Sequence, residues 1–179
     1  MPKNRADSKK VIAVVLAAGA SARFGSSKLL VEVDGRPLVQ RAAGAARDCC
    51  GDRSVLVAGH DAARVIAGSG RACQFLLVND DYRNGLGSSI ALAARALQHC
   101  ADALLLMLAD QALIRGDDLK RMLRHWDGTD DAIVASRFGG TLCPPALFGR
   151  ATFARLAALH GDQGARPLFD EPAFRLTDV

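Results

Sequence analysis

Short apolar runs alternate with longer amphipathic stretches along most of this chain, and no other feature of the sequence constrains the fold as much. The apolar runs predict a buried strand at 11–16 and further strands at 54–58, 75–78, 103–108 and 132–135. The stretches between them predict helices at 37–48, 61–67, 88–99 and 117–125. Because the strand runs are continuously apolar, we expect both faces of the sheet to be covered. Such repetition predicts an α/β fold with a mostly parallel sheet and helices on both faces.

The alternation weakens after residue 136. A Gly-Gly pair at 139–140 and a Pro-Pro pair at 144–145 mark a segment that we expect to be irregular. Two short helical stretches are expected after it, near 150–159 and 164–170. No linker is long enough to divide the chain.

Length and composition fit one folded domain. The chain has 179 residues, of which 50% are hydrophobic and 23% are charged. A packed core is therefore expected over residues 11–179. Residues 1–10 are polar and basic and precede the first apolar run, so we expect them to form a flexible N-terminal tail.

Charge, aromatic content and cysteine usage exclude several classes of protein. The net charge of +4 is small and only 5% of residues are aromatic, which argues against a nucleic-acid-binding surface. No apolar run approaches the roughly 18 residues that a membrane span needs. Five cysteines without a C-x-x-C pair predict reduced thiols rather than disulfides or a zinc site. These features together predict a cytoplasmic protein without a membrane or nucleic-acid partner.

The segment after the first strand carries the strongest functional signal. Residues 16–28 read L-A-A-G-A-S-A-R-F-G-S-S-K. Small residues let the backbone approach a ligand, and successive N–H groups can surround an anion. Arg23 and Lys28 add the positive charge that a polyphosphate requires. A Walker A loop is excluded, because Phe24 stands where that motif requires its second glycine. A G-x-G-x-x-G dinucleotide loop is excluded as well, because Ser21 and Phe24 stand at its second and third glycine positions.

Two further polar clusters follow predicted strands. Gly85, Gly87, Ser88 and Ser89 follow the strand at 75–78, and either serine is suited to cap the next helix or to face a ligand. Asp110 follows the strand at 103–108, where it is placed to cap a turn or to bind Mg²⁺. Ligands bind beyond the carboxyl ends of parallel strands, so we expect these clusters and the 16–28 segment to converge.

The motif L-A-A-G-x-S-x-R-x-G-x-x-K resembles the N-terminal signature of the MobA-like nucleotidyltransferases. Three later segments resemble that family as well: G-L-G-S-S at 85–89, D-Q at 110–111, and P-A-L-F at 145–148. Ala112 stands where the family usually has proline after D-Q. The resemblance implies a Rossmann-like, doubly wound fold of the nucleotide-diphospho-sugar-transferase type.

The resemblance also implies roles for single residues. Lys28 and Arg23 are the expected catalytic side chains, and Asp110 is the expected ligand of Mg²⁺. The expected nucleotide-binding residues are Leu16, Ala17, Ala18, Gly19, Lys28, Gly85, Gly87, Ser88 and Ser89. In the later segment G-D-Q-G-A-R, Arg166 is placed either to hold an acceptor phosphate or to end a solvated helix, and Asp162 is expected to cap a helix.

Within the family, the chain is most similar to the CTP:molybdopterin cytidylyltransferase branch. Ala18 favours CTP over GTP, because the guanylyltransferase branch has glycine there. The resemblance implies molybdopterin as the acceptor and a molybdoenzyme as the recipient of the product. Family members also carry a D-x-D-T-P-E-D segment whose Asp helps to bind the metal. The sequence ends at Val179 without it, so a second carboxylate ligand is not predicted.

Two alternatives remain open from the sequence. The same loop serves nucleotidyltransferases that act on sugar phosphates or other small phosphates. A non-catalytic protein that carries nucleotide or molybdenum cofactor would also need such a loop, and the missing carboxylate segment favours that alternative.

Overall fold

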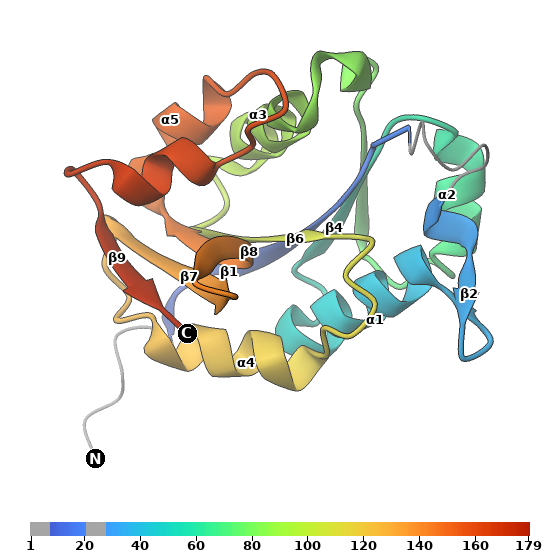
Figure 1. Ribbon diagram of the computed structural model, residues 1–179, viewed down its shortest axis with the longest axis horizontal. Coiled ribbons are helices and arrows are strands. Elements are labelled where there is room, and N and C mark those ends of the chain that lie inside the picture. Colours follow the sequence, from blue (N-terminus) through green and yellow to red (C-terminus); the bar gives the residue numbers. More distant parts are fainter. Residues whose placement is uncertain (1–7, 21–27) are drawn as a thin grey trace.

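The computed structural model describes residues 8–20 and 28–179, which form a layered α/β structure around a central sheet (Figure 1). In the described part of the chain this sheet has seven strands. Their spatial order is β5 (Phe75–Val78), β4 (Ser54–Ala58), β1 (Val11–Ala17), β6 (Ala103–Leu108), β8 (Thr141–Gly149), β7 (Ala132–Phe138) and β9 (Arg175–Asp178). A small hairpin of β2 (Glu32–Val33) and β3 (Arg36–Pro37) lies apart from the sheet.

The strand directions confirm the predicted, mostly parallel sheet. β1 pairs in parallel with β4 and β6, β4 pairs in parallel with β5, and β7 pairs in parallel with β9. Only β8, among the described strands, runs against both of its neighbours. The continuous apolar runs have the expected consequence in β1 and β4, which are buried along their whole length, but not in the edge strand β5, where only Leu77 is partly buried.

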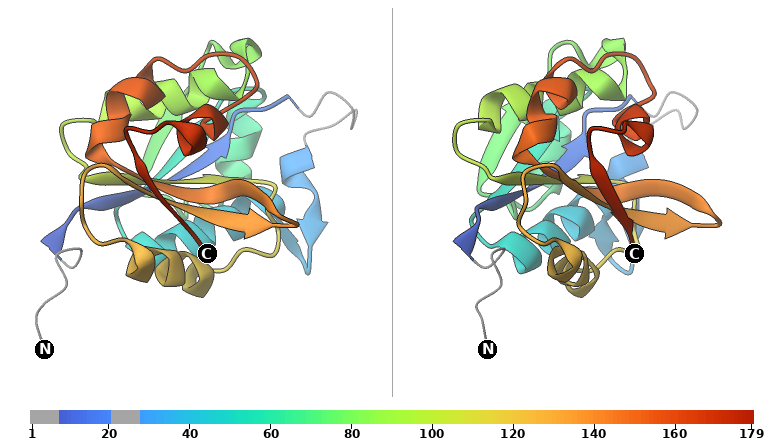
Figure 2. Two further views of the ribbon diagram at one scale, coloured as in Figure 1. Left: turned by 60° about the vertical axis from the view of Figure 1, so that its left-hand side comes forward. Right: turned by 90° about the vertical axis from the view of Figure 1, so that its left-hand side faces the viewer.

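Helices cover both faces of the sheet, as predicted. The α-helices are α1 (Leu38–Cys50), α2 (Ala62–Gly68), α3 (Leu86–Leu97), α4 (Gly116–His125) and α5 (Phe153–Ala157). Short 3₁₀ helices are η2 (Lys28–Leu30), η3 (Tyr82–Asn84), η4 (Arg150–Thr152) and η5 (Arg166–Asp170). α1 and α4 lie on one side of the sheet and α3 and α5 on the other (Figures 1 and 2).

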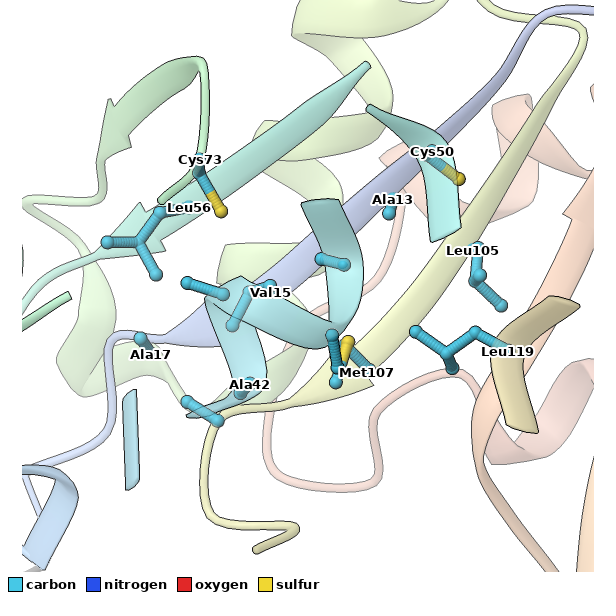
Figure 3. Close-up of a cluster of buried hydrophobic side chains, with 14 of the residues drawn as sticks. Ala13, Val15, Ala17, Ala42, Cys50, Leu56, Cys73, Leu105, Met107 and Leu119 are labelled. Atoms are coloured by element: carbon cyan, nitrogen blue, oxygen red, sulfur yellow. The ribbon is translucent and has the colours of Figure 1, made fainter. Parts of the chain in front are cut away.

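Side chains of β1 divide between two cores because successive residues of a strand point to opposite faces. The odd-numbered residues, among them Ala13 and Val15, pack with α1 and α4 (Figure 3). The even-numbered residues, among them Val14, pack with α3 and α5. Trp126, at the end of α4, is buried in the first core. The doubly wound fold is thus the direct result of strands that are apolar on both faces.

The segment predicted to be irregular after residue 136 is instead a strand, so that prediction was wrong. β8 spans nine residues and pairs with both β6 and β7. Its register against β7 shifts between Ala135 and Ser136, which leaves Pro144 and Pro145 outside the regular ladder. A bulge of this kind tolerates residues that cannot donate a ladder hydrogen bond. The prolines therefore mark an irregularity within a strand rather than a break in the fold.

The last strand was not predicted either. β9 is exposed at all four residues, so it lacks the apolar signal of a strand. Backbone pairing with β7 holds it, and exposed ion pairs flank it: Arg175 contacts Asp127 and Asp131, and Arg137 Nε lies 2.6 Å from Asp178 Oδ2. The backbone N–H of Thr129, with help from Arg175, lowers the pKa of Asp127 to about 2.

Two of the predicted helix caps are absent. Asp61 precedes α2 with a positive φ of 52° and makes no capping bond; its carboxylate accepts a hydrogen bond from Arg64 instead. α3 begins at Leu86, with Gly85 before it, so Ser88 and Ser89 lie inside its first turn. The cap predictions were wrong because local sequence allows a side chain to cap without deciding where the helix starts.

The first described residues contact the body of the fold. The backbone N–H of Lys10 donates to Asp102 at 2.8 Å, which anchors that residue of the predicted tail; residues 1–7 lie outside the described part. All five cysteines are free thiols, as expected. None of the helices in the described ranges is long and apolar enough to cross a membrane.

Candidate active site

The carboxyl ends of β1, β5 and β6 meet at one edge of the sheet, and a cavity of about 440 Å³ opens there. Its lining comes from segments far apart in the sequence. The lining residues are Leu16, Ala17, Ala18, Gly19, Ala20, Lys28, Leu29, Tyr82, Arg83, Gly85, Leu86, Ser89, Leu108, Ala109, Asp110 and Asp162. The structure therefore brings together the three polar clusters that the sequence places after strands.

The turn after β1 forms one wall of this cavity. The Leu16 carbonyl accepts a hydrogen bond from the Ala109 N–H at 3.0 Å, and the Ala18 carbonyl accepts one from the His60 N–H at 3.1 Å. These bonds hold the turn rigidly between β4 and β6. A Cβ added at Gly19 would meet no described atom within 4 Å, so its backbone faces open space. A turn with this exposure lets a ligand approach the main chain closely.

Lys28 and Asp110 meet in the cavity although 82 positions separate them. Lys28 Nζ lies 3.0 Å from Asp110 Oδ2, and each side chain is about two-fifths exposed, 40% and 39%. Lys28 opens η2, which the buried side chain of Leu29 anchors. The site thus has a cation and a carboxylate beside open backbone. Arg23, the other expected catalytic residue, lies outside the described residues.

The turn after β5 is shaped by a distant loop rather than by open space. The Gly87 N–H donates to the Gly161 carbonyl at 2.8 Å, and the Gly161 N–H donates to the Asn84 carbonyl at 2.9 Å. A Cβ at Gly85 would lie 2.4 Å from Gly161 C, and one at Gly87 would lie 2.7 Å from His160 C. Both glycines are therefore required by the close approach of residues 160–162.

The serines of α3 brace the same turn. Asn79 Nδ2 donates to Ser88 Oγ and Ser89 Oγ, each at 2.9 Å. Ser88 Oγ also lies within hydrogen-bond distance of the Gly85 carbonyl. Gly85 and Ser89 line the cavity, whereas Gly87 and Ser88 lie behind its wall. The roles expected of the last two residues would then be indirect, through the position of the turn.

Three of the polar lining residues were not singled out from the sequence for this site: Tyr82, Arg83 and Asp162. Tyr82 and Ala18 both lie close to Gly59, since a Cβ added there would meet Ala18 Cβ and Tyr82 Cβ, each at 2.8 Å. The Arg83 guanidinium lies 5.2 Å from the Tyr82 ring centroid. Tyr82 and Arg83 lie just before the G-L-G-S-S segment, which the sequence did single out. Nothing in the local sequence predicts that their side chains line a cavity.

Asp162 does not begin a helix, so its predicted capping role is wrong. It lies in a turn before η5, and its carboxylate makes no hydrogen bond or ion pair within the described ranges. The two backbone hydrogen bonds of the neighbouring Gly161 place Asp162 at the cavity. Asp162 therefore adds a second carboxylate, beside that of Asp110, to the lining.

The donor set suits a magnesium ion. Mg²⁺ takes one or two carboxylates and completes its shell with water and phosphate oxygens. Asp110 is a half-exposed carboxylate at the cavity, and the groups present contain no thiolate or imidazole that would favour a softer metal. The residues fit a cation that is bound jointly by the protein and by a phosphate ligand.

A second cavity of about 220 Å³ adjoins the first and shares Leu16, Leu86 and Leu108 with it. Its other walls come from β8, α3 and η5, and most of them are apolar. The remaining lining residues are Ile90, Leu106, Thr141, Leu142, Cys143, Pro144, Ala146, Phe148, Gln163, Gly164, Ala165, Arg166 and Phe169. Arg166 is thus placed at this second cavity and not at the first.

Comparisons with known proteins agree with this geometry. Residues 13–176 match the family model described as "MobA-like NTP transferase domain". The purine catabolism protein PucB of Bacillus subtilis is 29% identical over 166 residues, which cover 88% of this chain and 80% of PucB. The bifunctional protein GlmU of Syntrophotalea carbinolica is 32% identical over 145 residues, 79% of this chain but only 30% of GlmU.

Solved structures are similar as well. Rv0371c from Mycobacterium tuberculosis superposes with a TM-score of 0.79 and 26% identity, over 95% of this chain and 87% of that one. The same protein has been solved in complex with manganese.

Proposed function

The chain belongs to the family of MobA-like NTP transferase domains, and from this premise we propose that it transfers the CMP group of CTP to the phosphate of molybdopterin, releasing pyrophosphate. The contact between Lys28 and Asp110, beside the open backbone of the turn after β1, carries the proposal. A cation, a carboxylate and main-chain amides at one edge of a parallel sheet are what a nucleoside triphosphate and its metal require.

The triphosphate would lie along residues 16–20. Backbone N–H groups there, with Lys28 and Arg23, would hold the phosphate oxygens and stabilise the charge that develops on the leaving pyrophosphate. The acceptor phosphate would attack the α-phosphorus of CTP in line. No nucleophilic side chain is needed, since transfer of this kind depends on position and charge rather than on covalent catalysis.

Asp110 would hold Mg²⁺, the proposed cofactor. A bound magnesium ion supplies charge neutralisation at the phosphates between which the bond breaks. In the ligand-free arrangement Lys28 neutralises Asp110. We propose that Lys28 turns from this carboxylate to a phosphate when CTP and metal bind, because its side chain is exposed enough to move.

The second cavity would hold the acceptor. Its walls are mostly apolar, and an apolar wall stabilises the face of a flat ring system. Each hydroxyl group of a sugar buried there would instead need a polar partner, at a cost of about 1–3 kcal/mol for each one left unpaired. Arg166 stands at this cavity and would pair with the acceptor phosphate. These features support molybdopterin over a sugar phosphate.

Ala18 supports CTP over GTP through the family resemblance and through the space that its side chain occupies. Its Cβ is buried at the cavity wall, beside Gly59 and Tyr82, so a bulkier base would have less room there than beside glycine.

The decisive experiment measures pyrophosphate release. The purified chain is incubated with Mg²⁺ and each of CTP, GTP, UTP and ATP, first with molybdopterin and then with glucosamine 1-phosphate. We expect release with CTP and molybdopterin only. Release with the sugar phosphate instead would establish the alternative acceptor class.

The non-catalytic alternative predicts a different result. A carrier would bind CTP or molybdopterin without releasing pyrophosphate, and it would pass cofactor to a molybdoenzyme. Titration of each ligand by calorimetry, alongside the pyrophosphate measurement, separates binding from turnover. Tight binding of both ligands without any turnover would overturn the proposed transfer.

A further inference from the structure

The outer edge of β5 is apolar and uncovered. β5 is the first strand of the sheet, and no other described strand pairs with its far side. Phe75, Leu76 and Val78 are 59%, 47% and 50% exposed. Edge strands of monomeric proteins are usually protected by a short length, a charge, a proline, a bulge or a covering segment. β5 is short, with four residues, but its sequence F-L-L-V contains neither a charge nor a proline.

Backbone N–H and C=O groups of β5 point outward at this edge. The Asn79 N–H donates to the Ala58 carbonyl of β4 at 2.8 Å. The backbone N–H and C=O groups of the odd-numbered residues of β5 therefore point toward β4. Because the backbone groups of successive strand residues point to alternate edges, those of Leu76 and Val78 point outward. A strand laid along β5 would therefore meet unpaired donors and acceptors as well as apolar side chains.

Charges of opposite sign flank the strand. Arg71 lies before it, and Asp80 and Asp81 lie directly after it. All three side chains are exposed, and none forms an ion pair with another described residue. An antiparallel second copy of this strand would bring the basic end of each copy to the acidic end of the other. A parallel copy would put like charges together.

We propose that this edge is the dimer interface of the chain: β5 of one copy pairs antiparallel with β5 of a second copy about a two-fold axis at Leu76. Leu76 then lies opposite Leu76, and Phe75 lies opposite Leu77, an aromatic–aliphatic cross-strand pair. Arg71 of each copy reaches the end where Asp81 of the partner subunit lies. The same patch serves both copies, as a closed two-fold interface requires.

The arrangement joins the two sheets into one and keeps the active sites separate. Antiparallel pairing puts the carboxyl ends of the two β5 strands, and with them the two cavities, at opposite edges of the joined sheet. Each site is complete within one copy, so the dimer does not depend on the proposed transfer reaction. Failure of one proposal leaves the other standing.

The first test measures molar mass by sedimentation equilibrium over a range of protein concentrations. We expect the wild-type chain to reach twice its 18.9 kDa mass. Leu76→Lys should remain monomeric at all concentrations, because two lysines would face each other at the axis. Leu113→Lys is the matched control: Leu113 is 83% exposed but lies away from β5, so the dimer should persist. A wild-type monomer at every concentration, or a dimer that survives Leu76→Lys, overturns the proposal.

The second test reverses charges, and it stays informative if Leu76→Lys does not fold. Arg71→Asp and Asp81→Arg should each weaken the dimer roughly tenfold, because two exposed pairs turn from attraction to repulsion. Mixing the two single variants should restore a tight heterodimer, since every Asp then faces an Arg. The double variant should form a homodimer with wild-type affinity. If mixing restores nothing, the antiparallel register is wrong.

Discussion

The two adjoining cavities of this protein differ in nearly every property except their shared wall of three leucines. The larger one is built from backbone and charge: the open turn after β1, Lys28, Asp110, Arg83 and Asp162. The smaller one is built from β8, α3 and η5, and its wall is largely aliphatic and aromatic, with Arg166 as its cation. One suits a polyanion with a metal, and the other suits a flat ligand with one phosphate.

The difference suggests that phosphate binding and acceptor recognition are assigned to different parts of the sheet. The carboxyl ends of parallel strands supply main-chain groups and strand-end side chains, which are well placed for phosphates. The antiparallel strand β8 supplies an apolar face, which is well placed for recognition of an acceptor. If this division is real, substitutions in one cavity should change the constants of one substrate only.

The largest effect is expected from Lys28→Ala. Loss of a preorganised cation at the phosphates should lower kcat by on the order of 10²–10³. The KM for the acceptor should hardly change, because Lys28 lines only the first cavity. Steady-state kinetics with both substrates varied would show this. Lys120→Ala is a suitable control, since Lys120 is an exposed residue of α4. Activity within a few-fold of wild type would remove Lys28 from the proposed role.

Asp110→Asn should act on the metal. Without the carboxylate, the Mg²⁺ concentration for half-maximal activity should rise by at least about tenfold, equivalent to roughly 1.4 kcal/mol. The variant should remain folded, because its partner Lys28 is exposed. Magnesium titration of the rate, with the melting temperature as a check on folding, measures the effect. An unchanged titration would exclude Asp110 as a ligand.

Arg166→Ala should act on the second cavity. We expect the KM for molybdopterin to rise roughly tenfold, since a hydrogen bond to a charged group contributes about 1.5–3 kcal/mol. The dissociation constant for CTP should stay the same. Arg124→Ala, at an exposed position of α4, should change neither constant. A rise in the CTP constant instead would mean that the two cavities do not divide the substrates.

The smallest effect is expected on the alkylation rate of Cys143, a thiol in the wall of the second cavity. Cys143 is half-buried in its wall, whereas Cys100 is exposed elsewhere. Molybdopterin at about four times its Kd should slow alkylation of Cys143 roughly fivefold, by simple occupancy. CTP should not protect Cys143, and neither ligand should protect Cys100. Peptide mass spectrometry after timed alkylation reports both thiols in the same sample. Equal labelling of Cys143 with and without molybdopterin would place the acceptor outside this cavity.

Much of the first cavity could be predicted from local sequence. The strands at 11–16, 54–58, 75–78 and 103–108 match β1, β4, β5 and β6 within a residue, because continuous apolar runs have few alternatives in a chain of this length. Their carboxyl ends then meet by the rules of parallel sheets. The convergence of the 16–28 segment with Asp110 followed from topology alone.

The second cavity could not be predicted in the same way. β8 carries a Pro-Pro pair, which usually ends a strand, and only the bulge opposite Ser136 makes it compatible with the sheet. β9 has no apolar pattern, because its four residues are exposed and it joins the sheet through backbone pairing with β7. The error in β8 hid the cavity that Cys143 and Arg166 line.

The sequence by itself determined the doubly wound layering, the order of the first strands and the chemistry of the turn after β1. These depend on residues close together in the chain, whose pattern of burial and flexibility is local. Tertiary structure alone decided that Gly85 and Gly87 make room for residues 160–162, and that an apolar cavity adjoins the charged one. Those contacts join distant segments through packing, and no local pattern encodes which distant segment will fill a given space.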